Sequence, residues 1–271
     1  KNIQVKVLPE IRGEMLTGRV ISNNGEGDVR NKEVALSIPG KSFMLRIVRT
    51  DANGNFIFIL DKLPMKQEVV IQVMDRFKEN YSIELDSAPK NFPSLKFDNQ
   101  LVVGPSFAEL IEEKSIALQI ENAYFQNKKD SIPVTGENEE FYASVHKEYV
   151  LDDFTRFATM EETIIEIIPE LYFTRNNGIY TIHFRNYGLQ EDRARYGETL
   201  ILVDGLPIQE VNELFAYPTK NIEKVDIVNH GYFYGPKLFN GVVNFVTKNQ
   251  DFTSEAKGDY ILRTEILRPN P

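Results

Sequence analysis

The first third of the chain is dominated by short runs in which apolar and polar residues alternate. Each run is too short for a helix and has the period of two that places alternate side chains on opposite faces of a strand. The predicted strands are Ile3–Val7, Leu16–Ser22, Glu33–Ile38, Phe43–Arg49, Asn55–Leu60, Glu68–Met74 and Tyr81–Leu85. Turn-forming residues separate these runs, as they do in small β-sandwiches. The pattern therefore predicts an all-β N-terminal domain.

A turn signal stands between the fourth and fifth of these runs. Asp51-Ala52-Asn53-Gly54 consists largely of residue types that tolerate a positive φ. We therefore expect the two flanking strands to form a hairpin. The same stretch resembles the opening of a calcium-binding loop, but Phe56 and Lys62 stand where that loop needs Gly and Glu. A turn is accordingly the prediction, and a metal site is not.

The apolar period changes in the middle of the chain. A stretch rich in Pro and Asn, Ser87–Pro93, ends the strand pattern. From Pro105 to about Asn127 the apolar residues recur near helical spacing, which predicts a helix. The following stretch, Lys128–Glu140, is polar and predicts an exposed loop. We expect a helical linker here and a new domain from about Phe141.

Helices and strands alternate in the last part of the chain, which predicts an α+β domain. Thr159 is expected to cap a short amphipathic helix over Met160–Ile168. The other predicted elements are a hairpin around Asn176-Asn177-Gly178 with room for a bulge, strands at Thr199–Val203, Ile222–Val228 and Gly241–Thr247, and a helix over Val211–Tyr217. The expected division is residues 1–95 for the sandwich, 96–140 for the linker, 141–250 for the α+β domain and 251–271 for a C-terminal tail.

Charge and composition exclude several classes of protein. With 31 Lys and Arg against 40 Asp and Glu, the net charge of -9 opposes binding to nucleic acid. The chain has no cysteine, which excludes disulfides and thiolate chemistry. No run approaches the roughly 20 apolar residues of a membrane-spanning helix. The Gly-rich stretches lack the spacing of a phosphate-binding loop, so no cofactor is predicted.

Three pieces of the N-terminal part resemble the carboxypeptidase-regulatory-like β-sandwich. They are Leu16–Val20, Val34–Ser37 and Thr50–Phe56, the last followed by Leu63-Pro64, and they stand in the order of that family. The family is an immunoglobulin-like (Ig-like) module common in secreted proteins of the Bacteroidetes type. The resemblance implies a spacer or partner-docking unit without chemistry of its own.

The last part resembles the plug of TonB-dependent outer-membrane receptors. The resemblance lies in Met160–Leu171, Leu200–Ile208, Ile222–Val228, Tyr234-Gly235 and Gly241–Lys248, again in the family's order. It implies an α+β plug-like domain in the periplasm or at the outer membrane. In that family the pair corresponding to Asp204-Gly205 reverses the chain after a strand.

The chain also departs from the receptor pattern. No acidic-hydrophobic TonB-docking segment precedes the plug-like part, and Phe184–Gly188 stands where the family has an Arg-Gly pair. A receptor barrel needs well over about 200 residues after the plug, whereas this chain continues from Lys248 only to Pro271. Either the sequence is a piece of a longer receptor, or it resembles barrel-less plug proteins of the Bacteroidetes type, which carry macroglobulin-like or Ig-like sandwiches upstream. The order of sandwich, helix and plug-like part favours the second, since the sequence from Tyr149 onward resembles that group more than true receptors.

The residues that could carry catalysis are few. His146, His183 and His230 lie in three different segments, without a nucleophile elbow or a metal-binding His-Glu pair. Asp204 could serve as a catalytic carboxylate, but no partner carboxylate accompanies it in the sequence, and turn formation is the expected role. We predict neither an enzyme nor a metal site.

Two features are candidates for binding and modification. The aromatic cluster Tyr232, Phe233, Tyr234 and Phe239 is flanked by Gly and Pro and could present apolar ring faces to a ligand, with core packing as the alternative. Asp86-Ser87-Ala88 and Asp130-Ser131-Ile132 resemble the O-glycosylation signal of Bacteroidetes-type periplasmic proteins. Ser87 and Ser131 are therefore candidate glycan sites.

These observations predict a non-catalytic protein of the periplasm or outer membrane that acts in binding, assembly or uptake. Its expected partner is a protein at the outer membrane, with a glycan or another nutrient as a further ligand. Two alternatives remain open: a structural or adhesive protein at the end of a macroglobulin-like chain of sandwiches, and a carbohydrate-binding module based on the aromatic cluster.

Overall fold

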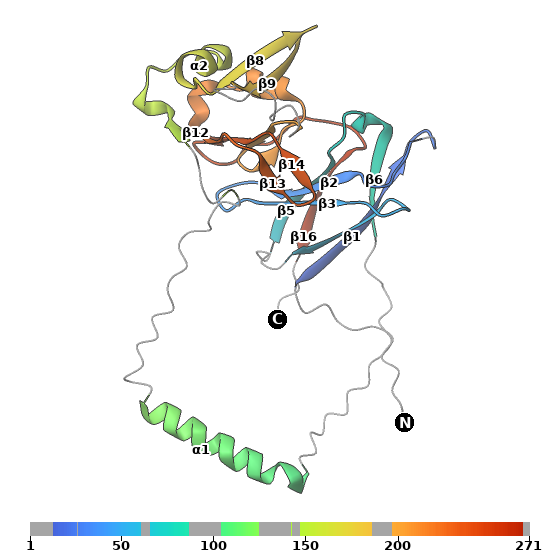
Figure 1. Cartoon of the computed structure of the whole chain (residues 1–271), viewed down its shortest axis with the longest axis vertical. Coiled ribbons are helices and arrows are strands. Elements are labelled where there is room, and N and C mark those ends of the chain that lie inside the picture. Colours follow the sequence, from blue (N-terminus) through green and yellow to red (C-terminus); the bar gives the residue numbers. More distant parts are fainter. Residues whose placement is uncertain are drawn as a thin grey trace. The chain divides into compact units, whose positions relative to one another are not determined.

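The computed structural model describes residues 13–25, 27–60, 66–86, 104–124, 142, 147–185 and 197–267. These residues form a mostly β structure with several antiparallel sheets, three α-helices and a mixed α+β region toward the C-terminus (Figure 1). The prediction of a β-rich first part followed by an α+β part is confirmed at this level. The predicted strand Ile3–Val7 lies outside the described residues.

Two antiparallel sheets share one hydrophobic core in the N-terminal part. Their strand orders are β4-β1-β6 and β16-β5-β2-β3. The strands are β1 (Glu14–Ser22), β2 (Glu33–Ile38), β3 (Met44–Arg49), β4 (Asn55–Leu60), β5 (Lys66–Val73), β6 (Tyr81–Leu85) and β16 (Ile261–Leu267), with a 3-10 turn, η1 (Lys78–Asn80), before β6. Strand β4 shows the alternation that the sequence predicts, since Phe56 and Phe58 are buried in the shared core and Ile57 is exposed.

The predicted hairpin at Asp51–Gly54 is wrong in its pairing, although the turn is present. The Asp51 carboxylate accepts hydrogen bonds from the main-chain N–H groups of Asn53 and Asn55, each at 2.8 Å, and Gly54 has a φ of 84°. The strands on either side pair elsewhere, β3 with β2 and β4 with β1. The turn residues signalled a chain reversal, but here the reversal carries the chain from one sheet to the other.

Part of the predicted C-terminal tail is a strand. β16 pairs with β5 in an antiparallel register from Ile261 opposite Gln72 to Leu267 opposite Lys66. Tyr260 and the partly buried Ile261, Leu262 and Ile266 pack into the core of the two N-terminal sheets. The expected tail therefore completes a sheet built from the first part of the chain.

A five-stranded sheet forms the centre of the C-terminal part. Its order is β11-β10-β15-β12-β7, with β10 and β15 parallel and the other neighbours antiparallel. Its strands are β7 (Lys147–Val150), β10 (Leu200–Val203), β11 (Leu206–Pro207), β12 (Ile222–Val228) and β15 (Val242–Thr247). Every residue of β10 and β15 is buried, and for β10 the apolar run Leu200–Val203 predicts a central strand covered on both faces.

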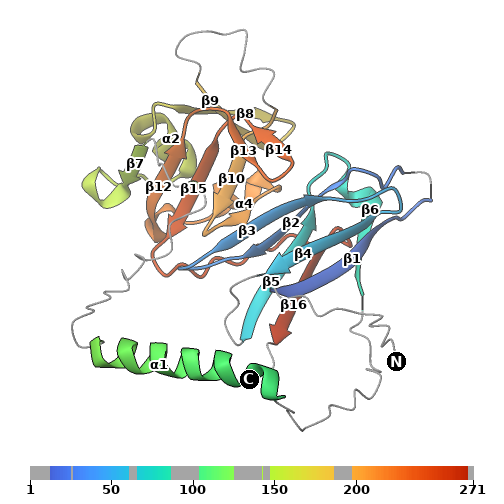
Figure 2. The same ribbon diagram turned by 60° about the horizontal axis from the view of Figure 1, so that its bottom comes forward.

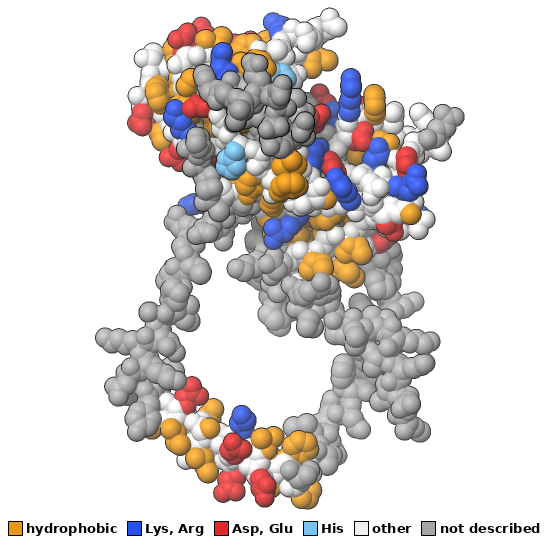
Figure 3. All heavy atoms as spheres, viewed as in Figure 1, with side chains coloured by type: hydrophobic (Ala, Val, Ile, Leu, Met, Phe, Trp, Pro, Cys, Tyr) orange, Lys and Arg blue, Asp and Glu red, His pale blue; other side chains and the backbone are white. Residues whose placement is uncertain are grey.

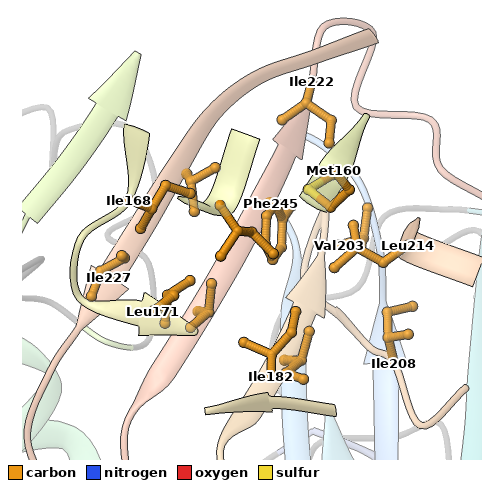
Figure 4. Packing of buried hydrophobic residues seen from close by; sticks show 14 of the residues in the cluster. Met160, Ile168, Leu171, Ile182, Val203, Ile208, Leu214, Ile222, Ile227 and Phe245 are labelled. Atoms are coloured by element: carbon orange, nitrogen blue, oxygen red, sulfur yellow. The ribbon is translucent and has the colours of Figure 1, made fainter. Parts of the chain in front are cut away.

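One face of this sheet is covered by two helices and a hairpin. These are α2 (Met160–Ile167), α4 (Val211–Ala216) and the hairpin of β8 (Leu171–Asn176) and β9 (Ile179–Phe184). Short 3-10 turns, η4 (Leu151–Asp153) and η5 (Thr219–Asn221), connect the elements. Side chains such as Met160, Leu171 and Phe245 point into the common core (Figure 4).

The local sequence signals explain α2 and the hairpin. Thr159 caps α2 as predicted: its hydroxyl accepts from the Glu162 main-chain N–H at 3.2 Å, and the Glu162 side chain bonds back to Thr159. The turn between β8 and β9 has two residues, Asn177 and Gly178, with φ values of 50° and 83°. This is the geometry that the Asn-Gly pair favours, and the turn contains no bulge.

The other face of the five-stranded sheet packs on the N-terminal part. A third buried cluster joins Ala35, Leu45 and Ile47 of β2 and β3 to Leu202 and Val242. Residues 1–86 and 140–271 accordingly form one compact unit, in which the sheets lie close together (Figure 2). Residues 87–139 form a second unit containing the 3-10 turn η2 (Pro105–Phe107) and α1 (Ala108–Tyr124), which confirms the predicted helix.

Candidate functional site

The predicted aromatic cluster forms a small hairpin. β13 (Tyr232–Tyr234) pairs with β14 (Lys237–Phe239), and Tyr232 lies opposite Phe239. Gly235 in the turn has a φ of 57°, and a Cβ atom added to it would overlap the Ile47 carbonyl oxygen of β3. The hairpin therefore lies directly on the N-terminal sheet (Figure 1).

Three of the four predicted binding residues attach this hairpin to the rest of the unit. Phe239 is only 2% exposed and belongs to the third buried cluster. The Tyr234 hydroxyl donates to the Leu45 carbonyl oxygen, and burial raises the pKa of Tyr234. Tyr232 stacks against Tyr234 with ring centroids 6.4 Å apart. These rings pack, and they do not form a free stacking surface.

Phe233 is the exception in this cluster. Its side chain is 75% exposed, and its strand neighbours Tyr232 and Tyr234 point to the opposite face, as the period of a strand requires. An exposed phenyl ring on a short hairpin is an apolar contact point for a partner. Phe233 is therefore the one member of the predicted set that is available for binding.

An ion pair further fixes the hairpin. Lys237 Nζ lies 2.8 Å from Glu33 Oε2 at the start of β2, and both side chains are largely buried. The Glu33 carboxylate also pairs with Arg49 at 3.1 Å through its other oxygen. The hairpin is thus held by packing, by the Tyr234 hydrogen bond and by this ion pair, which gives Phe233 a rigid base.

Asp204 has a structural role, in agreement with the sequence prediction. With φ values of 49° and 80°, Asp204 and Gly205 form the two-residue turn between β10 and β11. The carboxylate is buried and accepts from the Thr247 main-chain N–H at 2.7 Å, the Thr247 hydroxyl at 2.6 Å and the Phe252 main-chain N–H at 3.1 Å. These donors hold the turn in place and occupy both carboxylate oxygens.

The described histidines are not brought together. His183 stacks on Tyr172 with ring centroids 5.0 Å apart, and burial lowers its pKa. His230 is exposed and meets Tyr232 edge-on. Within the described part of the chain, no group of three or more His, Cys, Asp or Glu could hold a metal ion. His146, Ser87 and Ser131 lie outside the described residues.

A cavity of about 450 Å³ lies beside the hairpin. It is lined from four stretches of the chain: 74–78, 179–183, 197–201 and 207–211, together with Lys237, Phe239 and Asn240. Its volume falls within the range of ligand-binding cavities, about 300–1,000 Å³. Sequence reasoning missed this cavity because no single stretch contains a recognisable motif and only the fold brings the four together.

The surface carries charges of both signs. Acidic and basic side chains are interspersed over the visible face of the compact unit, without a large patch of one sign (Figure 3). No helix among the described residues combines the length and apolar character needed to cross a membrane.

No family model matches this chain, and no solved structure matches it.

Proposed function

We propose that this chain is a non-catalytic binding or assembly protein of the bacterial cell envelope, acting in the periplasm or at the outer membrane with an outer-membrane protein as its partner. In this proposal the first part is an Ig-like sandwich of the carboxypeptidase-regulatory-like type. The second part is an α+β domain like the plug of TonB-dependent receptors.

One observation carries the proposal. Three of the stretches that resemble the plug, Leu200–Ile208, Ile222–Val228 and Gly241–Lys248, contain strands β10, β12 and β15, which lie side by side in one sheet (Figure 2). The resemblance of these stretches rests on their sequence alone. Segments that share an ancestral domain are expected to share a core, so the adjacency supports the resemblance.

The N-terminal stretches give a second, weaker support. Leu16–Val20 lies in β1, Val34–Ser37 lies in β2, and Thr50–Phe56 contains the turn between β3 and β4 and the first two residues of β4. All three belong to the pair of sheets that share one core. This arrangement is consistent with a sandwich, a fold that commonly acts as a spacer or docking unit.

Phe233 offers a direct way to test the proposed role. A photo-crosslinking amino acid placed at residue 233 in the native host is expected to capture an integral outer-membrane protein. Ile57 is a matched control because it is also an exposed apolar residue, 55% against 75% for Phe233, and lies in β4 of the N-terminal part. The same adduct from both positions would indicate random collision, and an adduct with a cytoplasmic protein would contradict the proposal.

A further inference from the structure

Asparagine is followed directly by glycine at four places in the chain: residues 24–25, 53–54, 177–178 and 240–241. Such a pair is chemically labile, because glycine has no Cβ atom to hinder attack of its main-chain nitrogen on the side-chain carbonyl of the asparagine. The attack also needs an exposed side chain and a main chain that is free to rotate. The fold therefore decides which of the four pairs can react.

Two of the pairs are held inside the fold. Gly54 is buried, and its N–H donates to the Asp51 carbonyl at 3.1 Å. A Cβ atom added to Gly54 would lie 2.5 Å from the Val20 carbonyl oxygen. Gly241 is also buried, and a Cβ atom there would lie 2.5 Å from the Phe184 ring. Packing on all sides prevents these two main-chain segments from rotating.

The pair Asn24-Gly25 is exposed, but the attacking nitrogen is engaged. The Gly25 N–H donates to the Ser22 carbonyl at 3.2 Å, which closes a turn at the end of β1. This hydrogen bond must break before the Gly25 nitrogen can turn toward the Asn24 side chain. The pair at residues 24–25 is accordingly expected to react more slowly than an exposed pair without such a bond.

The pair Asn177-Gly178 meets both requirements. It lies at the outer end of the β8–β9 hairpin, which projects from the compact unit (Figure 1). Both residues are exposed, and a Cβ atom added to Gly178 would meet nothing within 4 Å. Within the part of the chain that the structure describes, the Gly178 N–H donates to no acceptor. Rotation of this segment meets no steric obstacle.

The side chain of Asn212 restrains this turn. Its amide oxygen accepts from the Tyr180 N–H at 2.9 Å, and its amide nitrogen donates to the Gly178 carbonyl at 2.8 Å. Asn212 belongs to α4, which packs on β9. One side chain from another element thus holds both sides of the Asn177-Gly178 peptide segment closed, and the turn must release it before the main chain can rotate.

We propose that Asn177 is a site of spontaneous deamidation and that Asn212 limits the rate of the reaction by holding the turn closed. The Gly178 nitrogen forms a bond to the Asn177 side-chain carbonyl carbon, and the bond from that carbon to the amide nitrogen breaks. Ammonia leaves with the proton of the Gly178 N–H, and a five-membered succinimide ring remains. Water then opens the ring, adding its hydroxyl to one carbonyl carbon and its proton to the Gly178 nitrogen.

The ring opens to two products with different effects on the hairpin. Addition of water at the side-chain carbonyl gives aspartate, which keeps the two-residue turn and adds one negative charge. Addition at the main-chain carbonyl gives isoaspartate, which lengthens the main chain by one methylene group. A lengthened turn no longer matches the pairing of Asn176 with Ile179 or the position of Asn212. The reaction therefore changes the conformation of an exposed hairpin.

Peptide mapping of the folded full chain during incubation in mildly alkaline buffer tests the proposed site. Trypsin cleaves after Arg175 and Arg185, and peptide 176–185 is expected to gain the mass of an acid at Asn177 before any other Asn-Gly pair is converted. Asn176 is a control in the same peptide, because it is also exposed but is followed by a residue with a Cβ atom. Earlier conversion at Asn24, Asn53 or Asn240, or no conversion at Asn177, would overturn the proposal.

Substitution of Asn212 tests the restraint. Asn212→Ala removes both hydrogen bonds to the turn and is expected to speed conversion of Asn177 by at least about fivefold. Asn212→Asp keeps an acceptor for the Tyr180 N–H but lacks the donor to Gly178, so an intermediate rate is expected. The rate at Asn24 should stay unchanged in both variants.

Two results of this substitution would contradict the role of Asn212. One is an unchanged rate at Asn177, and the other is an equal acceleration at Asn53 and Asn240, which would show general loosening of the fold. The proposal goes beyond the proposed envelope function. Its chemistry depends on the hairpin alone and not on where the protein resides, so its failure is distinguishable from failure of that function.

Discussion

The Asp204 carboxylate binds Thr247 twice, accepting its main-chain N–H at 2.7 Å and its hydroxyl at 2.6 Å. Asp204 follows the last residue of β10, and Thr247 is the last residue of β15, the parallel neighbour of β10. The pair therefore ties together the ends of two central strands. The Asp204 carbonyl also accepts from the Gly40 N–H at 3.0 Å, which connects this turn to the N-terminal part.

Replacing Asp204 is expected to destabilise the whole compact unit. Asp204→Asn keeps a residue type that tolerates positive φ but cannot accept at both side-chain positions. We expect the free energy of unfolding to fall by about 2–4 kcal/mol, because buried N–H donors lose their charged acceptor. Urea denaturation measures this change. Asp251→Asn, at an exposed residue nearby, should change the value by less than about 0.5 kcal/mol, and equal effects of the two variants would contradict the assigned role.

Substitution of Gly205 and of Gly178 distinguishes the cost of backbone strain from the cost of steric overlap. Their φ values are 80° and 83°, so Ala is strained at either position. A Cβ atom at Gly178 would meet nothing within 4 Å, whereas one at Gly205 would overlap the Phe43 ring. Gly178→Ala is expected to cost about 1–2 kcal/mol, and Gly205→Ala about 2–4 kcal/mol because overpacking adds to the strain. Thermal unfolding of the two variants gives the comparison, and similar losses would contradict close packing at Gly205.

Local signals predicted most elements, because the causes of those elements are local. The Asn177-Gly178 turn, the Thr159 cap and the apolar run of β10 depend on residues close in the sequence. The pairing of β16 with β5 and the separation of β3 from β4 into two sheets depend on partners that are distant in the chain. No local pattern at Ile261–Leu267 indicates that β5 has a free edge.

Strand β16 should therefore be essential for stability. A chain ending at Tyr260 loses the burial of Ile261, Leu262 and Ile266, which pack against the core of the two N-terminal sheets. Because these side chains are only partly buried, each contributes about half the free energy of a fully buried side chain. Together they account for about 3 kcal/mol of the unfolding free energy. The control is a chain ending at Leu267, which retains the whole strand. Equal urea midpoints for the two truncated chains would show that β16 contributes nothing.

The burial of the His183 ring is expected to make the stability of the fold depend on pH. Burial lowers its pKa from the usual value of 6.5, so the folded protein favours the neutral ring. The unfolded chain then binds more protons than the folded one as pH falls below 6.5, and stability decreases in that range. His183→Gln should reduce the loss of stability between pH 7 and pH 5, whereas His230→Gln, at an exposed ring, should not. A His183 pKa at or above 6.5 in an NMR titration would contradict this account.

The candidate site was predicted less completely than the fold. The aromatic residues 232–239 were recognisable in the sequence, but which rings face solvent depends on contacts with β2 and β3. Leu45 and Glu33, which hold Tyr234 and Lys237, come from about 200 residues earlier in the chain. The cavity lined by β9 and by the start of β10 was not predicted at all, since its lining comes from four stretches that only the fold brings together.

The most direct test of the proposed function is fractionation of the native host, followed by purification of the full-length protein with its bound partners. We expect the protein in the outer-membrane or periplasmic fraction, co-purifying with an integral outer-membrane protein. Recovery of the protein in the cytoplasmic fraction, without such a partner, would contradict the proposed function.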